Sequence, residues 1–193
     1  MITKKLSEIL EFQNGSKAVC RLGTIPVFGG NGVLGHSDTS NYSNVIIVGR
    51  VGAYCGSIHL ANGKCWVSDN AIAGIHKDPK CSKFNYYLMK SLNLGKQKIG
   101  SSQPLLTQQI LNNILVTIPD EATDQIRIAE ILSVLDDKIE LNNKINQELE
   151  KTAKDLYNYW FVQFDFPDGN KRPLLSRIFN LLKPFKISEV CYA

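Results

Sequence analysis

Three glycines with the spacing G-x-G-x-x-G are the first residues in this sequence that suggest chemistry. Gly30, Gly32 and Gly35 lie in the stretch TIPVFGGNGVLGHSDTSN, directly after the short apolar run 25–28. In a dinucleotide-binding protein such glycines connect a strand to a helix, whose N-terminus holds the pyrophosphate, and an acidic residue follows about 20 positions later. Here turn-forming residues and the apolar run VIIVG follow instead, and Arg50 occupies the acidic position. We therefore predict no nucleotide site, but a hairpin turn in which glycine lets the backbone approach a ligand or a neighbouring strand.

A metal site is the second chemistry to consider, because the chain has 5 cysteines and 3 histidines. Cys55, His59 and Cys65 are close in sequence, but their spacing matches no zinc-binding pattern. A fourth ligand would have to come from elsewhere, such as His76 or Cys81. No pair forms C-x-x-C, and an odd number argues against a complete disulfide framework. We predict buried thiols and no metal.

Catalytic motifs are missing from the sequence. It contains no G-x-S-x-G, no H-E-x-x-H, no P-loop and no cofactor loop of the methyltransferase type. We predict a recognition protein that is not an enzyme and binds no cofactor.

The composition predicts a folded protein of one or two domains. Of its 193 residues, 44% are hydrophobic and 21% are charged, which is enough to bury a core. No apolar run approaches the roughly 20 residues that a membrane helix needs. The N-terminal sequence MITKKLSEIL lacks the features of a signal peptide. The expected localisation is cytoplasmic.

The charges divide the chain into three parts. Residues 1–119 carry 12 Lys and Arg against 5 Asp and Glu, a net charge of +7. Residues 120–161 carry 5 against 10, net −5, and residues 162–193 carry 5 against 3, net +2, which agrees with the total of +4. A basic domain suits a polyanionic partner, whereas scattered lysines also serve solubility, and charge alone does not decide between these readings.

The basic part is expected to be a β-rich domain over residues 1–119. Short apolar runs separated by Gly, Asn, Asp and Ser predict strands, and Asn62-Gly63 predicts a hairpin turn. A short helix is predicted within 1–17, another over 82–94 and a third beginning near Pro104. The expected strands are 25–28, 44–48, 57–60, 71–75 and the run ILVTIP that ends at Pro119.

A single long helix is predicted over residues 120–161, because 124–161 contain neither Gly nor Pro. Its 38 residues would span about 57 Å at about 1.5 Å per residue. Asp120, Glu121 and Asp124 stand where a helix N-terminus favours negative charge. Ten positions, which we call the heptad seam, alternate in steps of four and three, as in a coiled coil. They are Ile128, Leu132, Leu135, Ile139, Asn142, Asn146, Leu149, Ala153, Leu156 and Trp160.

The heptad seam predicts a partner helix, since an apolar stripe of this length is unstable in water. Asn142 and Asn146 flank position 144, the midpoint between Ile128 and Trp160. In an antiparallel homodimer the asparagines of both chains would meet there and fix the alignment of the helices. The alternative is that both asparagines face solvent. The overall expectation is an α+β protein: a β-rich recognition domain followed by one long coiled-coil helix.

Six stretches then point to one family. In order they are TIPVFGGNGVLGHSD, VIIVGRVGAYCG, CWVSDNAIAG, IGSSQPLLTQQILNNILVTIP, DQIRIAEILSVLDDKIELNNKINQELE and LYNYWFVQFDFP. Over roughly residues 5–168 the chain resembles one half of the specificity subunit of type I restriction-modification systems. The resemblance implies a target-recognition domain that binds double-stranded DNA but catalyses no reaction, and that is joined to a spacer helix. By the same resemblance, companion subunits methylate adenine in the DNA, or translocate and cut the DNA.

A full subunit of that family has two recognition domains joined by two antiparallel helices, which set the gap in a bipartite target. By this resemblance the partners are DNA, methyltransferase and restriction subunits, and a second specificity half or a second copy. Residues 162–193 form a tail of uncertain structure, and residues 169–193 of it do not resemble the family. The chain is either a natural half-subunit that dimerises or a truncated product.

Polar residues in or near loops of the basic domain are the DNA-binding candidates. Arginine and glutamine can read guanine and adenine edges, while serine and lysine commonly hold phosphate. For each residue the alternative is a turn-capping or solvated role, and Arg50 could instead brace the fold between Gly49 and Gly52. The other class of function left open is an assembly protein whose basic domain binds protein. The candidates are Asn31, Arg50, Tyr54, Asn70, Lys98, Ser101, Ser102 and Gln103.

Overall fold

The computed structural model describes residues 1–17, 22–96 and 105–162. The chain divides into two compact units, one of residues Met1–Asp137 and the other beginning at Lys138. In the described parts of the chain, no helix is long and apolar enough to span a membrane.

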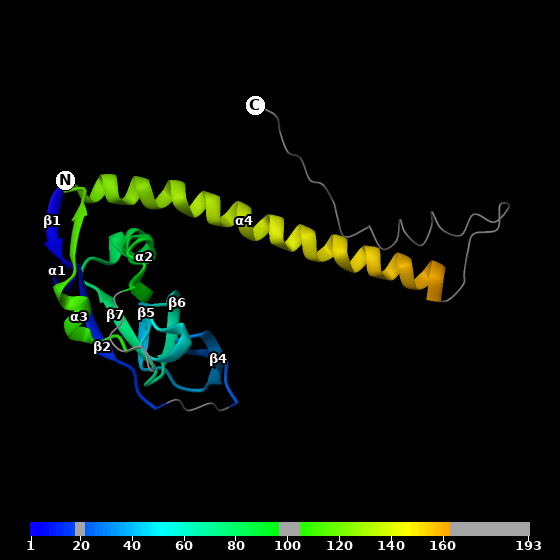
Figure 1. Cartoon of the computed structure of the whole chain (residues 1–193), viewed down its shortest axis with the longest axis horizontal. Coiled ribbons are helices and arrows are strands. Elements are labelled where there is room, and N and C mark those ends of the chain that lie inside the picture. Colours follow the sequence, from blue (N-terminus) through cyan, green and yellow to red (C-terminus); the bar gives the residue numbers. More distant parts are fainter. Residues whose placement is uncertain (18–21, 97–104, 163–193) are drawn as a thin grey trace. The chain divides into compact units, whose positions relative to one another are not determined.

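A six-stranded sheet is the centre of the first unit (Figure 1). The order of its strands is β2-β7-β5-β6-β3-β4, and all neighbours are antiparallel except β3 and β6, which run parallel. The strands are β2 (Leu10–Asn14), β3 (Ile25–Gly29), β4 (Gly32–Ser37), β5 (Tyr42–Gly49), β6 (Ile58–Val67) and β7 (Ala71–His76).

A second, two-stranded sheet joins the two ends of this domain. Strand β1 (Ile2–Lys5) pairs antiparallel with β8 (Leu115–Ile118), so that Ile2 lies opposite Ile118. The helices and helical turns are α1 (Leu6–Ile9), η1 (Gly52–Tyr54), η2 (Pro79–Cys81), α2 (Ser82–Ser91), η3 (Leu94–Lys96), α3 (Gln108–Asn113), α4 (Ala122–Tyr157) and η4 (Asn158–Val162).

Both faces of the sheet are buried, and β5 shows why. Its side chains alternate, so Ile46 and Val48 join the larger core that contains Leu6, Met89 and other residues of α1–α3. Val45 and Ile47 point to the opposite face, into a smaller core with residues of β6 and β7. A strand buried on both sides has a continuous apolar run rather than an alternation in its sequence, and VIIV at residues 45–48 is such a run.

The predicted α+β class is confirmed, and several boundaries differ. The expected helix within 1–17 is only the four-residue α1, flanked by β1 and β2, so most of that prediction was wrong. The helix expected over 82–94 ends at Ser91. The helix expected near Pro104 begins at Gln108, where the Thr107 hydroxyl accepts a hydrogen bond from the Ile110 N–H at 3.3 Å and caps it.

Asn62-Gly63 is not a hairpin turn, and that prediction was wrong. Strand β6 continues through both residues to Val67. Its pairing with β5 shifts between Ser43 and Val45, which marks a β-bulge opposite Asn44. The Gly63 N–H donates to the Asn44 side-chain oxygen at 2.7 Å, and Gly63 has φ +94°.

The glycine-rich stretch forms the predicted hairpin. Gly29 of β3 pairs with Gly32 of β4, leaving Gly30 and Asn31 as the connection. Gly30 lies against the backbone of Gly49, where a Cβ on Gly30 would be 3.4 Å from the Gly49 Cα atom. This is an ordinary contact distance, so the contact between the two backbones constrains Gly49, whose Cβ would lie 3.2 Å from the Gly30 Cα atom, more than Gly30.

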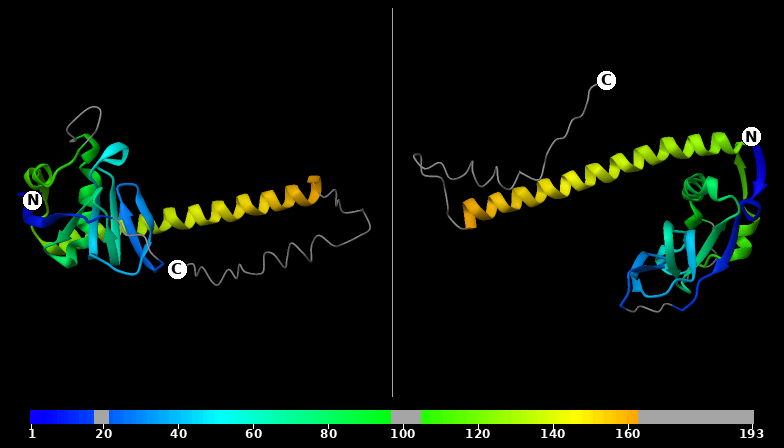
Figure 2. Two further views of the ribbon diagram at one scale, coloured as in Figure 1. Left: turned by 90° about the horizontal axis from the view of Figure 1, so that it is seen from below. Right: turned by 180° about the vertical axis from the view of Figure 1, so that it is seen from behind.

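Helix α4 has 36 residues and runs unbroken in each view (Figure 2). Four seam residues, Ile128, Leu135, Ile139 and Leu149, have exposed side chains. A second stripe lies beside the seam and is also exposed, with values of up to 66% at Ile131. The second stripe consists of Ile131, Val134, Leu141 and Ile145.

The buried His76 makes the stability of the first unit depend on pH. Its Nδ1 lies 3.3 Å from the Asn85 side-chain nitrogen, and its Nε2 is buried without a hydrogen-bond partner. Burial lowers the pKa of His76 below its usual 6.5, so the unfolded chain binds the proton more readily than the folded one. Stability is therefore complete above about pH 6.5 and falls as the pH drops toward the folded-state pKa.

We expect the melting temperature to fall more steeply between pH 7 and pH 5 in the wild type than in His76→Gln, which cannot titrate there. Thermal denaturation followed by circular dichroism at several pH values measures this difference. Parallel curves for the two proteins would contradict it.

Candidate nucleic-acid interface

Three turns of the first unit meet at one edge of the six-stranded sheet. Phe28 of β3 pairs with Val67 of β6 in parallel, and Gly49 at the end of β5 pairs with Ala71 at the start of β7. Although β5 runs antiparallel to β6, the Arg50 N–H donates to the Asn70 carbonyl at 3.0 Å, and a Cβ on Gly30 would lie 3.4 Å from the Gly49 Cα atom, so the turns that follow β3, β5 and β6 lie together. We call the turns 30–31, 50–56 and 68–70 that follow them the recognition edge.

Backbone hydrogen bonds fix the longest of these turns. The Gly49 N–H donates to the Ser57 carbonyl at 2.9 Å, and the Gly56 N–H donates to the Gly49 carbonyl at 2.8 Å. The Ser57 hydroxyl donates to the Gly30 carbonyl and so ties this turn to the β3–β4 hairpin. Gly52, with φ +73°, supplies a backbone conformation that other residues rarely adopt. The turn therefore presents its side chains from a rigid frame.

Arg50 connects three segments through its main chain. Its N–H donates to the Asn70 carbonyl at 3.0 Å, and its own carbonyl accepts the Leu106 N–H at 2.9 Å and the Cys55 thiol at 3.3 Å. The Nε of its side chain is shielded from solvent and has no acceptor among the residues that the structure describes. The main chain thus braces the fold, while the guanidinium keeps an unsatisfied donor.

The other described candidates surround Arg50. Asn31 and Asn70 are exposed in their turns, and Tyr54 is 53% exposed. A Cβ on Gly30 would lie 3.7 Å from both the Asn70 carbonyl oxygen and the Tyr54 Cβ atom. The structure therefore brings Asn31, Arg50, Tyr54 and Asn70 together.

Lys98, Ser101, Ser102 and Gln103 lie outside the described residues. The chain is described again from Leu105, which forms a β-bridge with Val51 beside Arg50.

Val51 of this edge, and Lys17 near it, were not among the candidates from the sequence. Val51 is 39% exposed on the 50–56 turn. Lys17 is exposed next to Ser16, which forms a bridge with Ser68. Val51 could have been found from its place between Arg50 and Gly52, but the position of Lys17 depends on pairing between distant segments.

The cysteines and histidines of the described chain form no group of three or more potential ligands with Asp or Glu. Cys55, Cys65 and Cys81 are buried thiols that form no disulfide with one another. Burial raises the pKa of Cys65 to about 11, so its thiol stays protonated at neutral pH and is a poor nucleophile.

A rigid set of turns bearing amide, guanidinium and aromatic side chains is typical of a recognition protein. A family described as the type I restriction modification DNA specificity domain matches residues 1–151. The chain belongs to this family, as the sequence predicted. Specificity subunits of the family are non-catalytic, in agreement with the prediction that this chain is not an enzyme.

Individual relatives resemble parts of the chain. It is 47% identical over 62 residues to the HindI specificity subunit of Haemophilus influenzae, covering 32% of this chain and 13% of that subunit. It is 35% identical over 95 residues to the MjaIX specificity subunit of Methanocaldococcus jannaschii, covering 47% and 22%. The chain thus matches less than a quarter of the length of these relatives.

Solved structures confirm the fold. The S subunit from M. genitalium superposes with a TM-score of 0.70 at 21% identity, covering 94% of this chain and 50% of that one. The HsdS subunit from Thermoanaerobacter tengcongensis gives a TM-score of 0.56 at 17% identity, covering 83% and 44%.

Proposed function

We propose that this chain recognises one half of a bipartite DNA target within a type I restriction-modification complex in the cytoplasm. The observation that carries the proposal is the recognition edge, where Arg50, Asn31, Asn70 and Tyr54 converge on one rigid frame in a basic domain.

The chemistry of the recognition edge suits base reading. Arginine pairs with guanine O6 and N7, asparagine pairs with adenine N6 and N7, and apolar groups contact the thymine methyl. Arg50, Asn31 and Asn70 supply the polar groups, and Val51 and Tyr54 the apolar ones. Lys98, Ser101, Ser102 and Gln103 complete the proposed DNA-binding set, as phosphate and base contacts.

Helix α4 would serve as the spacer and the assembly surface. Its heptad seam would pair antiparallel with the same helix of a second copy or of a second specificity half. The second stripe leaves another apolar face beside that pair, which suits helices of methyltransferase or restriction subunits.

Replacing Arg50 with alanine tests base reading. If Arg50 reads a base, Arg50→Ala will relax specificity at one position of the target and cost about 1–3 kcal/mol of binding free energy. The measurement is selection of bound duplexes from a random-sequence pool, followed by sequencing and by titration of the selected duplex at several salt concentrations. The logarithm of the wild-type affinity should fall linearly with that of the salt concentration.

Lys64→Ala is the matched control, because Lys64 is an exposed cation in β6, outside the recognition edge. It should leave the selected sequence unchanged. An Arg50→Ala protein that melts earlier and binds every sequence equally badly would show that Arg50 is structural. Affinity independent of salt would favour a protein partner over DNA.

A further inference from the structure

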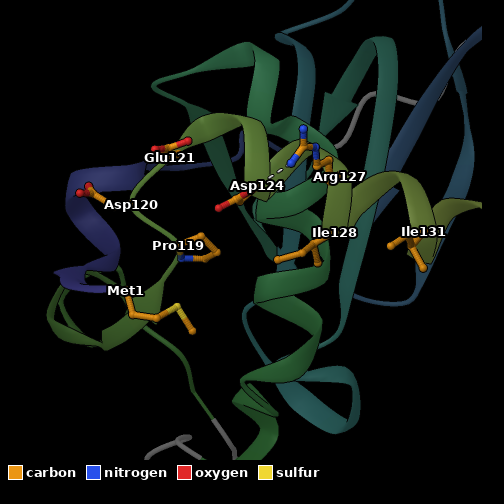
Figure 3. A pocket seen from close by; sticks show the side chains of 8 residues that line it. All are labelled: Met1, Pro119, Asp120, Glu121, Asp124, Arg127, Ile128 and Ile131. Carbon is orange, nitrogen blue, oxygen red and sulfur yellow. Dashed lines mark ion pairs between the residues drawn. The ribbon is translucent and has the colours of Figure 1, made fainter.

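A cavity of about 520 Å³ lies in the first unit where β8 ends and α4 begins (Figure 3). Met1, Pro119, Ile128 and Ile131 give it apolar walls, while Asp120, Glu121, Asp124 and Arg127 supply charge. The pairing of β1 with β8 brings the start of the chain to this place.

The apolar side of this cavity is open to solvent. Met1 is 85% exposed, and both isoleucines are exposed as well. Among the described residues, Asp124 forms an ion pair with Arg127 at 3.6 Å inside the cavity, and Glu121 accepts a hydrogen bond from the Thr123 hydroxyl at 3.2 Å. An open apolar hollow with an acidic rim suits a side chain that is mainly apolar but carries a hydrogen-bond donor.

The heptad seam leads directly into the cavity, because Ile128 belongs to both. An antiparallel pairing centred on position 144 sets Ile128 of one chain opposite Trp160 of the other. The side chain that meets Ile128 and the cavity is therefore the indole of Trp160, which is apolar apart from its N–H donor. The size also fits, since small-molecule pockets of about 300–1,000 Å³ hold groups larger than an indole.

Two features of the arriving segment match the cavity. The Trp160 Nε1 is buried and has no acceptor within the described part of the chain, a cost that a carboxylate of the rim would remove. Residues 151–160 contain two cations, Lys151 and Lys154, and one anion, Asp155, so their net charge is positive. The cavity is lined by three carboxylates and one cation, Arg127, so its net charge is negative. The net charges are therefore opposite.

We propose that this cavity is the seat for Trp160 of a second copy of this chain. The inference rests on the antiparallel pairing in the proposed function and adds a specific end contact to it. By two-fold symmetry each dimer has two such seats, which oppose sliding of one helix along the other.

The fluorescence of Trp160 can show whether its side chain is buried in the cavity. The chain has 2 tryptophans, so a Trp66→Phe background leaves Trp160 as the single emitter. Its emission should shift to shorter wavelength and become protected from acrylamide over the same concentration range in which sedimentation shows dimers. Far-UV circular dichroism checks that each variant is folded.

Ile131→Asp should abolish this shift and weaken dimerisation about tenfold. Val134→Asp is the matched control, because Val134 is equally apolar and exposed on α4 but does not line the cavity. It should leave the emission and the dimer unchanged. Trp160→Ala should weaken the dimer as Ile131→Asp does, and the double variant should lose little more than either single variant.

The outcomes separate this inference from the proposed function. A dimer in which Trp160 emission does not change and Ile131→Asp has no effect would overturn the seat and leave the pairing intact. A chain that stays monomeric with α4 folded would overturn both the seat and the self-pairing, while DNA selection would still test recognition.

Discussion

Gly49→Ala is expected to displace the 50–56 turn and to lower the affinity for the selected DNA at least about tenfold, with a loss of about 1–3 kcal/mol of folding stability. A Cβ on Gly49 would come within 3.0 Å of the Tyr54 carbonyl oxygen and the Ser57 hydroxyl oxygen. It would also lie 3.2 Å from the Gly30 Cα atom. Since backbone atoms cannot move aside cheaply, the turn that carries Arg50 and Tyr54 must shift.

Gly30→Ala is the matched control, because it makes the same change on the other side of the same backbone contact. Its Cβ would lie 3.4 Å or more from all neighbours, which is ordinary contact distance. It should bind DNA almost as the wild type does. The measurements are thermal melting and titration of the selected duplex well below the melting temperature. A Gly49→Ala protein with unchanged binding would exclude the turn from the DNA interface.

The sequence predicted those elements that depend on local pattern. Strand β5 is a continuous apolar run between turn residues, and α4 combines heptad spacing with an absence of Gly and Pro, so both were found. The sequence KKLSEILEF has helical spacing too, but the pairing of β1 with β8, more than 100 residues away, decides its structure. Tertiary contacts of this kind override local preference.

The bulge at Asn62-Gly63 shows the limit of turn signals. A glycine with positive φ after asparagine suits a hairpin turn and a β-bulge alike. The deciding residue is Asn44, which lies 19 positions from Gly63 and accepts its N–H. A short stretch of sequence around Asn62 does not include Asn44 and so cannot distinguish a turn from a bulge.

The sequence indicated which types of residue form the candidate site, but it did not show that these residues lie close together. Asn31, Arg50, Tyr54 and Asn70 stood out as polar or aromatic residues in turn sequences. Their convergence depends on the parallel pairing of β3 with β6 and on the Arg50–Asn70 hydrogen bond, both between distant segments. Val51 was missed although it stands between Arg50 and Gly52, because its apolar side chain gave no sign that it would be exposed.

Leu135→Asp or Leu149→Asp is expected to abolish self-association, with a dissociation constant raised at least about 100-fold, while the wild type forms a homodimer at micromolar concentration. Leu135 and Leu149 are exposed on the heptad seam in the single chain. In a paired helix each would be buried, and an unpaired carboxylate there costs several kcal/mol. Sedimentation equilibrium at several concentrations measures the change.

Gln147→Asp is the control, since it adds the same carboxylate at an exposed position off the seam, two residues before Leu149. It should leave the dimer intact. Asn142→Leu combined with Asn146→Leu addresses alignment: the double variant should still associate but lose its single orientation, because the central asparagines no longer penalise a slipped or parallel pairing. Disulfide trapping of cysteines introduced at the helix ends would reveal mixed orientations. If the wild type remains monomeric well above micromolar concentration with α4 intact, the heptad seam serves a different subunit, and the second half of the target must be read by another chain.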